Sequence, residues 1–186
     1  EQVHNHKGQP SLIALRPADA KETVACWKLA MENTQTPSAI LLTRQNIKDL
    51  PAGNDYAQVA KGGYVVYSDA QPDVVLVASG SEVSTLAQAG ELLHQDGIKY
   101  RVVSVPSEGL FRQQSPDYQA EVLPAGIKRY GLTAGLPVNL QGLVGENGKI
   151  HGVTTFGFSA PYKVLDEKLG FTPQQVYAQI KEFVGK

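Results

Sequence analysis

Short apolar runs of β-strand type alternate with helical patterns along most of the chain, and this alternation constrains the fold more than any other feature. Residues 12–15 form one such run, which stops at Arg16 and Pro17 because proline cannot continue a strand ladder. A helical segment follows, and a second run over residues 39–43 ends at Arg44. Two strands joined by a helix make a βαβ unit, which normally belongs to a parallel sheet. The sequence therefore predicts an α/β fold.

The helix between these two strands has its own start signal and an apolar stripe. Asp19 is expected to cap it, with Glu22 three residues later as the capping-box partner. Val24, Trp27 and Met31 recur at helical spacing. This spacing predicts that these three side chains face the core.

The pattern weakens over residues 45–72, where glycine, proline and asparagine recur. We interpret residues 51–72 as a linker between two domains, because these residues break both helical and strand periodicity. A short strand at 64–67 is expected to dock on the second domain. The chain is thus divided into residues 1–50, a linker, and residues 73–186.

The second domain resumes the alternation of strands and helices. It is expected to open with an all-apolar strand at 74–78 and a helix in which Gly90 allows a close neighbour and Gly97 marks the end. Ser159 and Thr172 are expected to cap two later helices. The other predicted strands and helices cover residues 101–105, 110–114, 129–133, 150–155, 160–169 and 173–184.

Composition and charge exclude several classes of protein. Hydrophobic residues make up 42% of the chain and charged residues 19%, which excludes intrinsic disorder. The 17 Lys and Arg against 18 Asp and Glu leave a net charge of −1, so no basic excess points to nucleic acid or an anionic membrane. The apolar runs are too short to span a bilayer. We therefore expect a cytoplasmic globular protein without nucleic-acid or membrane partners.

The turn formed by Ser79, Gly80, Ser81 and Glu82 lies where open α/β sheets bind ligands, between the end of a strand and the start of a helix. Its hydroxyl and backbone N–H groups suit a phosphate, but Glu82 repels an anion and no complete GxGxxG or GxxxxGK[ST] motif is present. The alternative is a tight turn that caps the helix, with Glu82 placed against the helix dipole. The second interpretation is favoured.

Two arginines stand at strand ends. Arg44 follows a buried strand, where its planar guanidinium can reach the expected crevice and make a bidentate contact with phosphate. The alternative for Arg44 is a structural ion pair or a solvated strand end. Arg16 is followed directly by Pro17, and we expect a structural role for it.

The other residues that could carry chemistry do not form a complete site. His4 and His6 are two residues apart without a third ligand nearby, and His94 and His151 stand alone, so no metal site is predicted. Cys26 is the only cysteine, which excludes an internal disulfide, and its place beside an apolar stripe favours inert packing. No Gly-x-Ser-x-Gly elbow indicates hydrolysis.

A series of short sequence blocks runs through the chain in a recognisable order. They are Arg16-Pro17-Ala18-Asp19, Trp27-Lys28, Leu42-Thr43-Arg44-Gln45-Asn46, Gly62-Gly63-Tyr64-Val65, Ala78-Ser79-Gly80-Ser81-Glu82-Val83, Arg101-Val102-Val103-Ser104-Val105-Pro106-Ser107, Phe111, Gln114, Val122-Leu123-Pro124, Val144-Gly145 and Phe156-Gly157-Phe158-Ser159-Ala160-Pro161. Several are weak alone. Together they resemble the transketolase family, from the end of its pyrimidine-binding domain through its C-terminal domain.

The resemblance implies a fold, an activity and one site residue. Residues 1–50 correspond to the last βαβ portion of an incomplete pyrimidine-binding domain, and residues 73–186 to a Rossmann-like C-terminal domain with a mostly parallel sheet. The family transfers a two-carbon ketol unit from a ketose phosphate, such as xylulose 5-phosphate, to an aldose phosphate, such as ribose 5-phosphate. It uses thiamine diphosphate with Mg²⁺ or Ca²⁺ and works as a homodimer. Arg44 matches the family arginine that contacts the sugar phosphate.

The chain starts at Glu1 without a Met, so we expect a fragment or a processed product. The family's diphosphate and metal motif and its activating glutamate have no counterpart in this sequence. The chain alone is therefore expected to be inactive, with no catalytic, cofactor-binding or metal-binding residue of its own.

The sequence also departs from the family and leaves alternatives open. Thr133 stands where many relatives have Glu, and Leu140 and Leu143 stand where Trp and Tyr are common, so the role of that loop is not carried over. A dihydroxyacetone synthase-type ketol transferase shares the architecture with a different acceptor. A non-catalytic module that binds small anions or a partner through the 79–82 turn is the third possibility.

Overall fold

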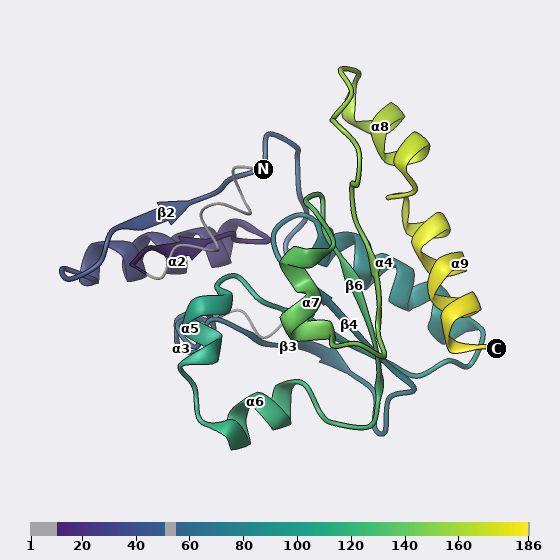
Figure 1. The fold of residues 1–186 in the computed structure, drawn as a ribbon, viewed down its shortest axis with the longest axis horizontal. Coiled ribbons are helices and arrows are strands. Elements are labelled where there is room, and N and C mark those ends of the chain that lie inside the picture. The colour runs from purple at the N-terminus through teal and green to yellow at the C-terminus, as the bar shows by residue number, and fades with distance from the viewer. Residues whose placement is uncertain (1–10, 51–54, 186) are drawn as a thin grey trace.

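The computed structural model describes residues 11–50 and 55–185 (Figure 1). His4, His6 and residues 51–54 of the expected linker lie outside the described residues. The elements, in chain order, are β1 (Ile13–Leu15), α2 (Ala20–Glu32), β2 (Ser38–Ile40), α3 (Tyr56–Val59), β3 (Tyr64–Ser68), β4 (Val74–Ala78), α4 (Glu82–Gln95), β5 (Tyr100–Ser104), α5 (Glu108–Arg112), α6 (Pro116–Val122), β6 (Lys128–Leu132), α7 (Val138–Val144), β7 (Lys149–His151), α8 (Tyr162–Leu169) and α9 (Pro173–Val184).

The strands form two sheets. A five-stranded sheet has the order β3-β5-β4-β6-β7, in which β3 runs antiparallel to β5 and every other neighbouring pair is parallel. β1 and β2 pair in parallel as a separate two-stranded sheet, joined by α2 in the expected βαβ manner. The predicted α/β class with a mostly parallel sheet is confirmed, and so is the docking of a short strand, β3, on the second sheet.

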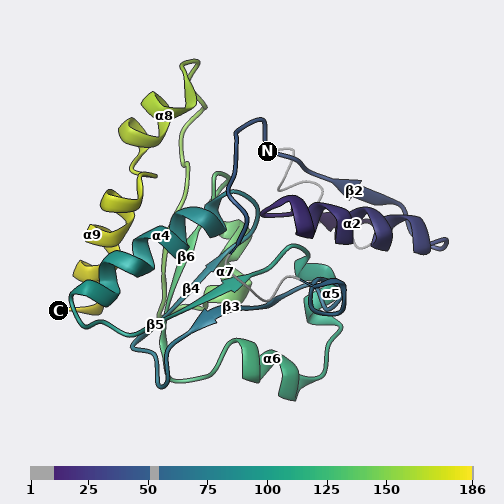
Figure 2. The same cartoon turned by 180° about the vertical axis from the view of Figure 1, so that it is seen from behind.

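Helices cover both faces of the five-stranded sheet, which explains why the central strand β4 is apolar at every position. On one face α4 and α9 lie side by side, as the view from behind shows (Figure 2). Their residues Leu86, Leu93 and Ile180 share one core cluster with Leu76 of β4. On the other face α5, α6 and α7 lie over the sheet, and their side chains form a second cluster with Val75 and Val77.

Residues 11–50, here called the N-terminal unit, pack against the first of these clusters. Leu15, Ala18, Ala25 and Cys26 belong to the same buried group as the α4 side of the five-stranded sheet. The unit therefore has a continuous core with the rest of the chain, although its own sheet has two strands.

The predicted core face of α2 is wrong. Val24, Trp27 and Met31 are 71%, 54% and 78% exposed. The buried side of α2 instead carries Glu22 and its helical neighbours Ala25 and Cys26. The first turn decides the rotation of the helix, because Glu22 is bonded to the five-stranded sheet and turns the 22, 25, 26 side inward.

Several element boundaries match the predictions and others do not. β4 and α9 have the expected bounds, and Gly90 lies so close to β5 that a Cβ there would be 2.2 Å from the Tyr100 ring. Ser159 does not cap α8, which begins at Tyr162 after Pro161. The strand expected over 150–155 is Lys149–His151, and the short helices α3, α6 and α7 were not predicted.

Among the described residues, no helix is long and apolar enough to span a bilayer.

Candidate functional site

The carboxyl ends of β1 and β4 meet where the N-terminal unit joins the five-stranded sheet. The backbone N–H of Arg16 donates to the Pro106 carbonyl at 2.8 Å, and the Gly80 N–H donates to the Arg16 carbonyl at 3.1 Å. Strand ends of parallel sheets are where α/β proteins place their ligands. The junction is therefore the region in which the predicted site residues must be assessed.

Arg16 fills the 79–82 turn. Its guanidinium pairs with the Glu82 carboxylate, with Nη1–Oε2 and Nη2–Oε1 distances of 2.7 and 2.9 Å, and also donates to the Ser79 carbonyl. Gly80 has φ +69°, and a Cβ there would lie 2.6 Å from Arg16 Cζ, so only glycine lets the arginine lie flat on the turn. The expected structural role of Arg16 is confirmed.

The same contacts change the interpretation of the turn itself. Glu82 is buried and also accepts a hydrogen bond from the Ala134 N–H at 2.8 Å. Ser81 makes no capping hydrogen bond, so capping by its hydroxyl does not explain the turn. The donors that a phosphate would use are already engaged, because the Gly80 N–H donates to the Arg16 carbonyl and the Ser81 hydroxyl donates to Glu82 at 3.3 Å. The structure therefore supports a structural junction here and gives no support to an anion cradle.

A second buried carboxylate, Glu22, fastens α2 to the five-stranded sheet. It accepts hydrogen bonds from the Tyr64 hydroxyl of β3 and the Ser104 hydroxyl of β5, each at 2.6 Å, and from the Ala18 N–H at 2.7 Å. It forms no ion pair with a described residue. Burial raises the pKa of Glu22, and the charge of Asp19 adds to this, while its three hydrogen bonds lower it. Glu22 therefore connects α2 of the N-terminal unit to β3 and β5 of the five-stranded sheet through hydrogen bonds.

Arg44 lies four residues beyond β2 and is exposed. Within the described residues its guanidinium makes no hydrogen bond or ion pair. It differs in this from Arg16, the other strand-end arginine, whose guanidinium is used within the fold. The Arg44 guanidinium thus has no partner within residues 11–50 and 55–185.

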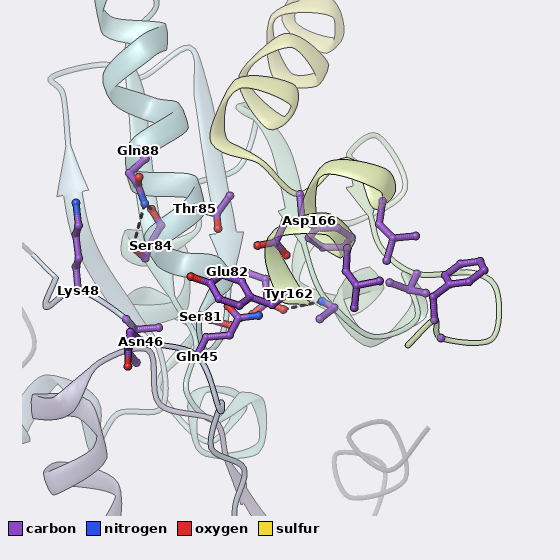
Figure 3. Close-up of a pocket in the computed structure, with 18 residues that line it drawn as sticks. Gln45, Asn46, Lys48, Ser81, Glu82, Ser84, Thr85, Gln88, Tyr162 and Asp166 are labelled. Atoms are coloured by element: carbon purple, nitrogen blue, oxygen red, sulfur yellow. Dashed lines mark hydrogen bonds between the residues drawn. The ribbon is translucent and has the colours of Figure 1, made fainter. Parts of the chain in front are cut away.

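A pocket of about 400 Å³ begins directly after Arg44 (Figure 3). Three parts of the chain enclose it, namely the loop at 45–48, the first two turns of α4, and α8 with the loop before it. Its lining residues are Gln45, Asn46, Ile47, Lys48, Ser81, Glu82, Ser84, Thr85, Gln88, Ala134, Val153, Gly157, Phe158, Tyr162, Leu165, Asp166, Leu169 and Phe171. Arg44 itself does not line it.

The sequence did not reveal this pocket. Asp166 enters it from α8, where burial foremost, and then the charge of Glu82, raise the pKa of its carboxyl. In the sequence Asp166 looks like any charged residue on an amphipathic helix, and it lies far from Thr85 and Gln45. No short-range sequence pattern indicates that these three residues line one pocket.

The described histidines and the cysteine make contacts within the fold. His151 contacts the Leu169 carbonyl through Nε2 at 2.8 Å, and His94 lies 3.6 Å from Asp69. Cys26 is buried, and burial raises its pKa to about 12, so the expected inert packing is confirmed. Among the described residues, no group of three or more His, Cys, Asp or Glu could hold a metal ion.

The chain is similar to known proteins over its whole length. Residues 62–172 match the family model described as transketolase-like TK C-terminal domain. The chloroplastic transketolase of Craterostigma plantagineum is 38% identical over 188 residues, covering 99% of this chain and 36% of that protein. The transketolase of Halalkalibacterium halodurans is 40% identical over 185 residues, covering 97% of this chain and 28% of that protein.

The fold agrees with solved transketolases. The crystal structure of the Pichia stipitis transketolase in complex with sedoheptulose 7-phosphate superimposes with a TM-score of 0.93 at 32% identity, covering 98% of this chain and 26% of that chain. This chain thus spans about a quarter to about a third of the length of the relatives it matches. With a family model that covers more than half of its residues, the chain belongs to the transketolase family.

Proposed function

We propose that this chain is the C-terminal section of an enzyme that transfers a two-carbon ketol unit between sugar phosphates. The donor is a ketose phosphate such as xylulose 5-phosphate and the acceptor an aldose phosphate such as ribose 5-phosphate. The observation that carries the proposal is the similarity to transketolases along 97–99% of the chain. The Pichia stipitis relative was crystallised with a sugar phosphate, which supports the same substrate class here.

Within that enzyme, Arg44 is proposed to contact the substrate phosphate. An exposed guanidinium that has no partner among the described residues can form two parallel hydrogen bonds to a phosphate at little cost of rearrangement. The net charge of −1 gives the chain no broad basic surface, so recognition of a phosphate depends on single placed cations of this kind.

The cofactor is proposed to bind elsewhere in the enzyme. Among the described residues, no group of three or more His, Cys, Asp or Glu could hold a metal ion, which supports a site for Mg²⁺ or Ca²⁺ and thiamine diphosphate outside this chain. No reaction step through the cofactor is assigned to this chain, and the chain by itself is expected to be inactive. The proposal also includes a homodimeric enzyme, a cytoplasmic location and the division of this chain into residues 1–50, 51–72 and 73–186.

The role of Arg44 can be tested in the enzyme that contains this section. Arg44→Gln should raise KM for phosphorylated donors by about tenfold or more, because a charge-assisted phosphate contact is lost. KM for an unphosphorylated donor such as erythrulose should stay unchanged. Arg112→Gln, at another exposed arginine on α5, is the matched control and should affect neither donor. An equal rise for both donors would contradict a phosphate contact.

The expected inactivity needs a separate assay. The 186-residue chain is incubated with thiamine diphosphate, Mg²⁺, xylulose 5-phosphate and ribose 5-phosphate. Turnover above that of buffer would show that the chain carries a complete active site, which the proposal denies.

A further inference from the structure

The pocket between the 45–48 loop, α4 and α8 has features of a ligand site that the proposed ketol transfer does not use. Its volume of about 400 Å³ is within the range of small-molecule sites. In the close-up, Gln45, Thr85, Tyr162 and Asp166 lie around the same space, although they come from three separate stretches of the chain (Figure 3).

Of the two carboxylates that line this pocket, Glu82 is paired with Arg16, and Asp166 has no counterion among the described residues. Its side chain is half-buried and makes no hydrogen bond or ion pair with any described residue. Burial foremost, and then the charge of Glu82, raise the pKa of Asp166, while Glu82 itself is engaged by Arg16 and the Ala134 N–H. Lys48, on the opposite side of the close-up, forms no ion pair with Asp166. A cation in the pocket would supply the missing partner.

Neutral polar groups flank this carboxylate. The hydroxyls of Thr85 and Tyr162 and the side-chain amide of Gln45 have no hydrogen-bond partner among the described residues, and all three line the pocket. Each can both donate and accept a hydrogen bond. They therefore suit a ligand that carries several hydroxyl groups.

The remaining wall is apolar. Leu165 and Leu169 of α8, with Val153 and Phe171, line the side next to Asp166. A wall of this kind packs against the carbon skeleton of a ligand, while the polar groups opposite fix its orientation.

We propose that this pocket binds a small hydroxylated organic cation, an amino polyol in chemical class, whose ammonium group pairs with Asp166 and whose hydroxyls contact Thr85, Tyr162 and Gln45. The carboxylate of Asp166, which has no counterion among the described residues, disfavours a phosphorylated sugar beside it. The site is thus separate from the phosphate contact proposed for Arg44, and it does not depend on the ketol-transfer activity.

Three probes of similar shape test the proposal on the ¹⁵N-labelled 186-residue chain by amide chemical-shift titration at neutral pH. Glucamine (1-amino-1-deoxysorbitol) is cationic, sorbitol is neutral and sorbitol 6-phosphate is anionic. Glucamine should cause saturable shifts at the amides of Thr85 and Asp166, with at least about tenfold weaker binding for sorbitol and weaker still for the phosphate. Equal binding of glucamine and sorbitol, tighter binding of the phosphate, or no binding of glucamine would overturn the proposal.

Two variants on the same helix provide the second readout. Asp166→Asn keeps the shape of the side chain and removes its charge, and it should weaken glucamine binding by about tenfold. Glu167→Gln removes an exposed charge one residue away and should leave binding within about twofold. Thr85→Val removes one hydroxyl and tests the pocket independently, in case Asp166→Asn fails to fold. It should weaken the binding of glucamine and of sorbitol to a similar extent. Unchanged glucamine binding in both Asp166→Asn and Thr85→Val would place the ligand elsewhere.

Discussion

Two buried glutamates join the N-terminal unit to the five-stranded sheet, and they do so by different chemistry. Glu82 of α4 faces Arg16, whose guanidinium lies 2.7 and 2.9 Å from its two oxygens. Glu22 of α2 faces hydroxyl and N–H donors from Tyr64, Ser104 and Ala18, with no cation among the described residues. One contact is an ion pair and the other is a carboxyl group held by neutral donors.

The difference predicts how each contact responds to perturbation. A buried ion pair is costly to break from one side, because the remaining charge stays buried without a partner. A buried carboxyl with neutral donors can instead take up a proton and stay in place, since protonation removes the charge that is costly to bury. The Glu82 contact should therefore be sensitive to mutation, and the Glu22 contact to pH.

The largest effect is expected from Arg16→Met. The variant keeps the aliphatic part of the side chain and leaves Glu82 buried without its cation, which should lower the free energy of unfolding by about 3 kcal/mol. Urea denaturation of the 186-residue chain measures this. Lys28→Met is the control, because its ion pair with Glu32 is exposed and contributes less than about 1 kcal/mol.

The double variant Arg16→Met/Glu82→Gln separates the two possible causes of that loss. If the unpaired charge of Glu82 is responsible, the second substitution should recover part of the stability. A double variant no more stable than Arg16→Met would show that the unpaired charge of Glu82 does not cause the loss, and the contrast drawn between the two glutamates would then be wrong.

The second prediction concerns pH. Because burial raises the pKa of Glu22 in the folded chain, the folded state holds this proton at pH values where the unfolded chain has lost it. The contribution of Glu22 to stability is therefore greatest at low pH, and it is lost as pH rises from about 4.5, the ordinary pKa of Glu, through the raised pKa. One proton gives a slope of at most about 1.4 kcal/mol per pH unit.

Glu22→Gln tests this assignment, because the amide has a similar shape and does not titrate. Urea denaturation of wild type and variant between pH 4 and pH 8 gives the difference in unfolding free energy at each pH. The wild type should lose stability relative to the variant as pH rises. A difference that stays constant over this range would show that Glu22 does not titrate above its ordinary pKa.

The same comparison shows what the sequence could and could not predict. The bounds of β4 and α9 were accessible because an all-apolar run and a Thr172-Pro173 start are local signals. The buried face of α2 was not, because it depends on the contacts of Glu22 with Tyr64 and Ser104, which lie 42 and 82 residues away. Val24, Trp27 and Met31 do lie along one stripe of the helix, but the spacing of apolar residues alone does not decide which side of a helix is buried.

The site residues divide in the same way. Arg44 could be chosen from its place after a strand and from the family resemblance, and its exposed guanidinium agrees with that choice, although its role stays a prediction. Arg16 was correctly expected to be structural, but its partner Glu82 was assigned to the helix dipole. Asp166 had no signal at all, because its surroundings are assembled from α4, α8 and the 45–48 loop.

The smallest effect is expected on the side of α2 that points away from Glu22. If the N-terminal unit is held through its inner face, the exposed stripe contributes little, and Trp27→Gln should change the free energy of unfolding by no more than about 0.5 kcal/mol. Leu15→Ala, at a fully buried position of the same unit, should cost about 2 kcal/mol or more in the same urea experiment. A loss above about 1 kcal/mol in Trp27→Gln would mean that this stripe is covered in solution, and the two glutamates would then not account for how the unit is held.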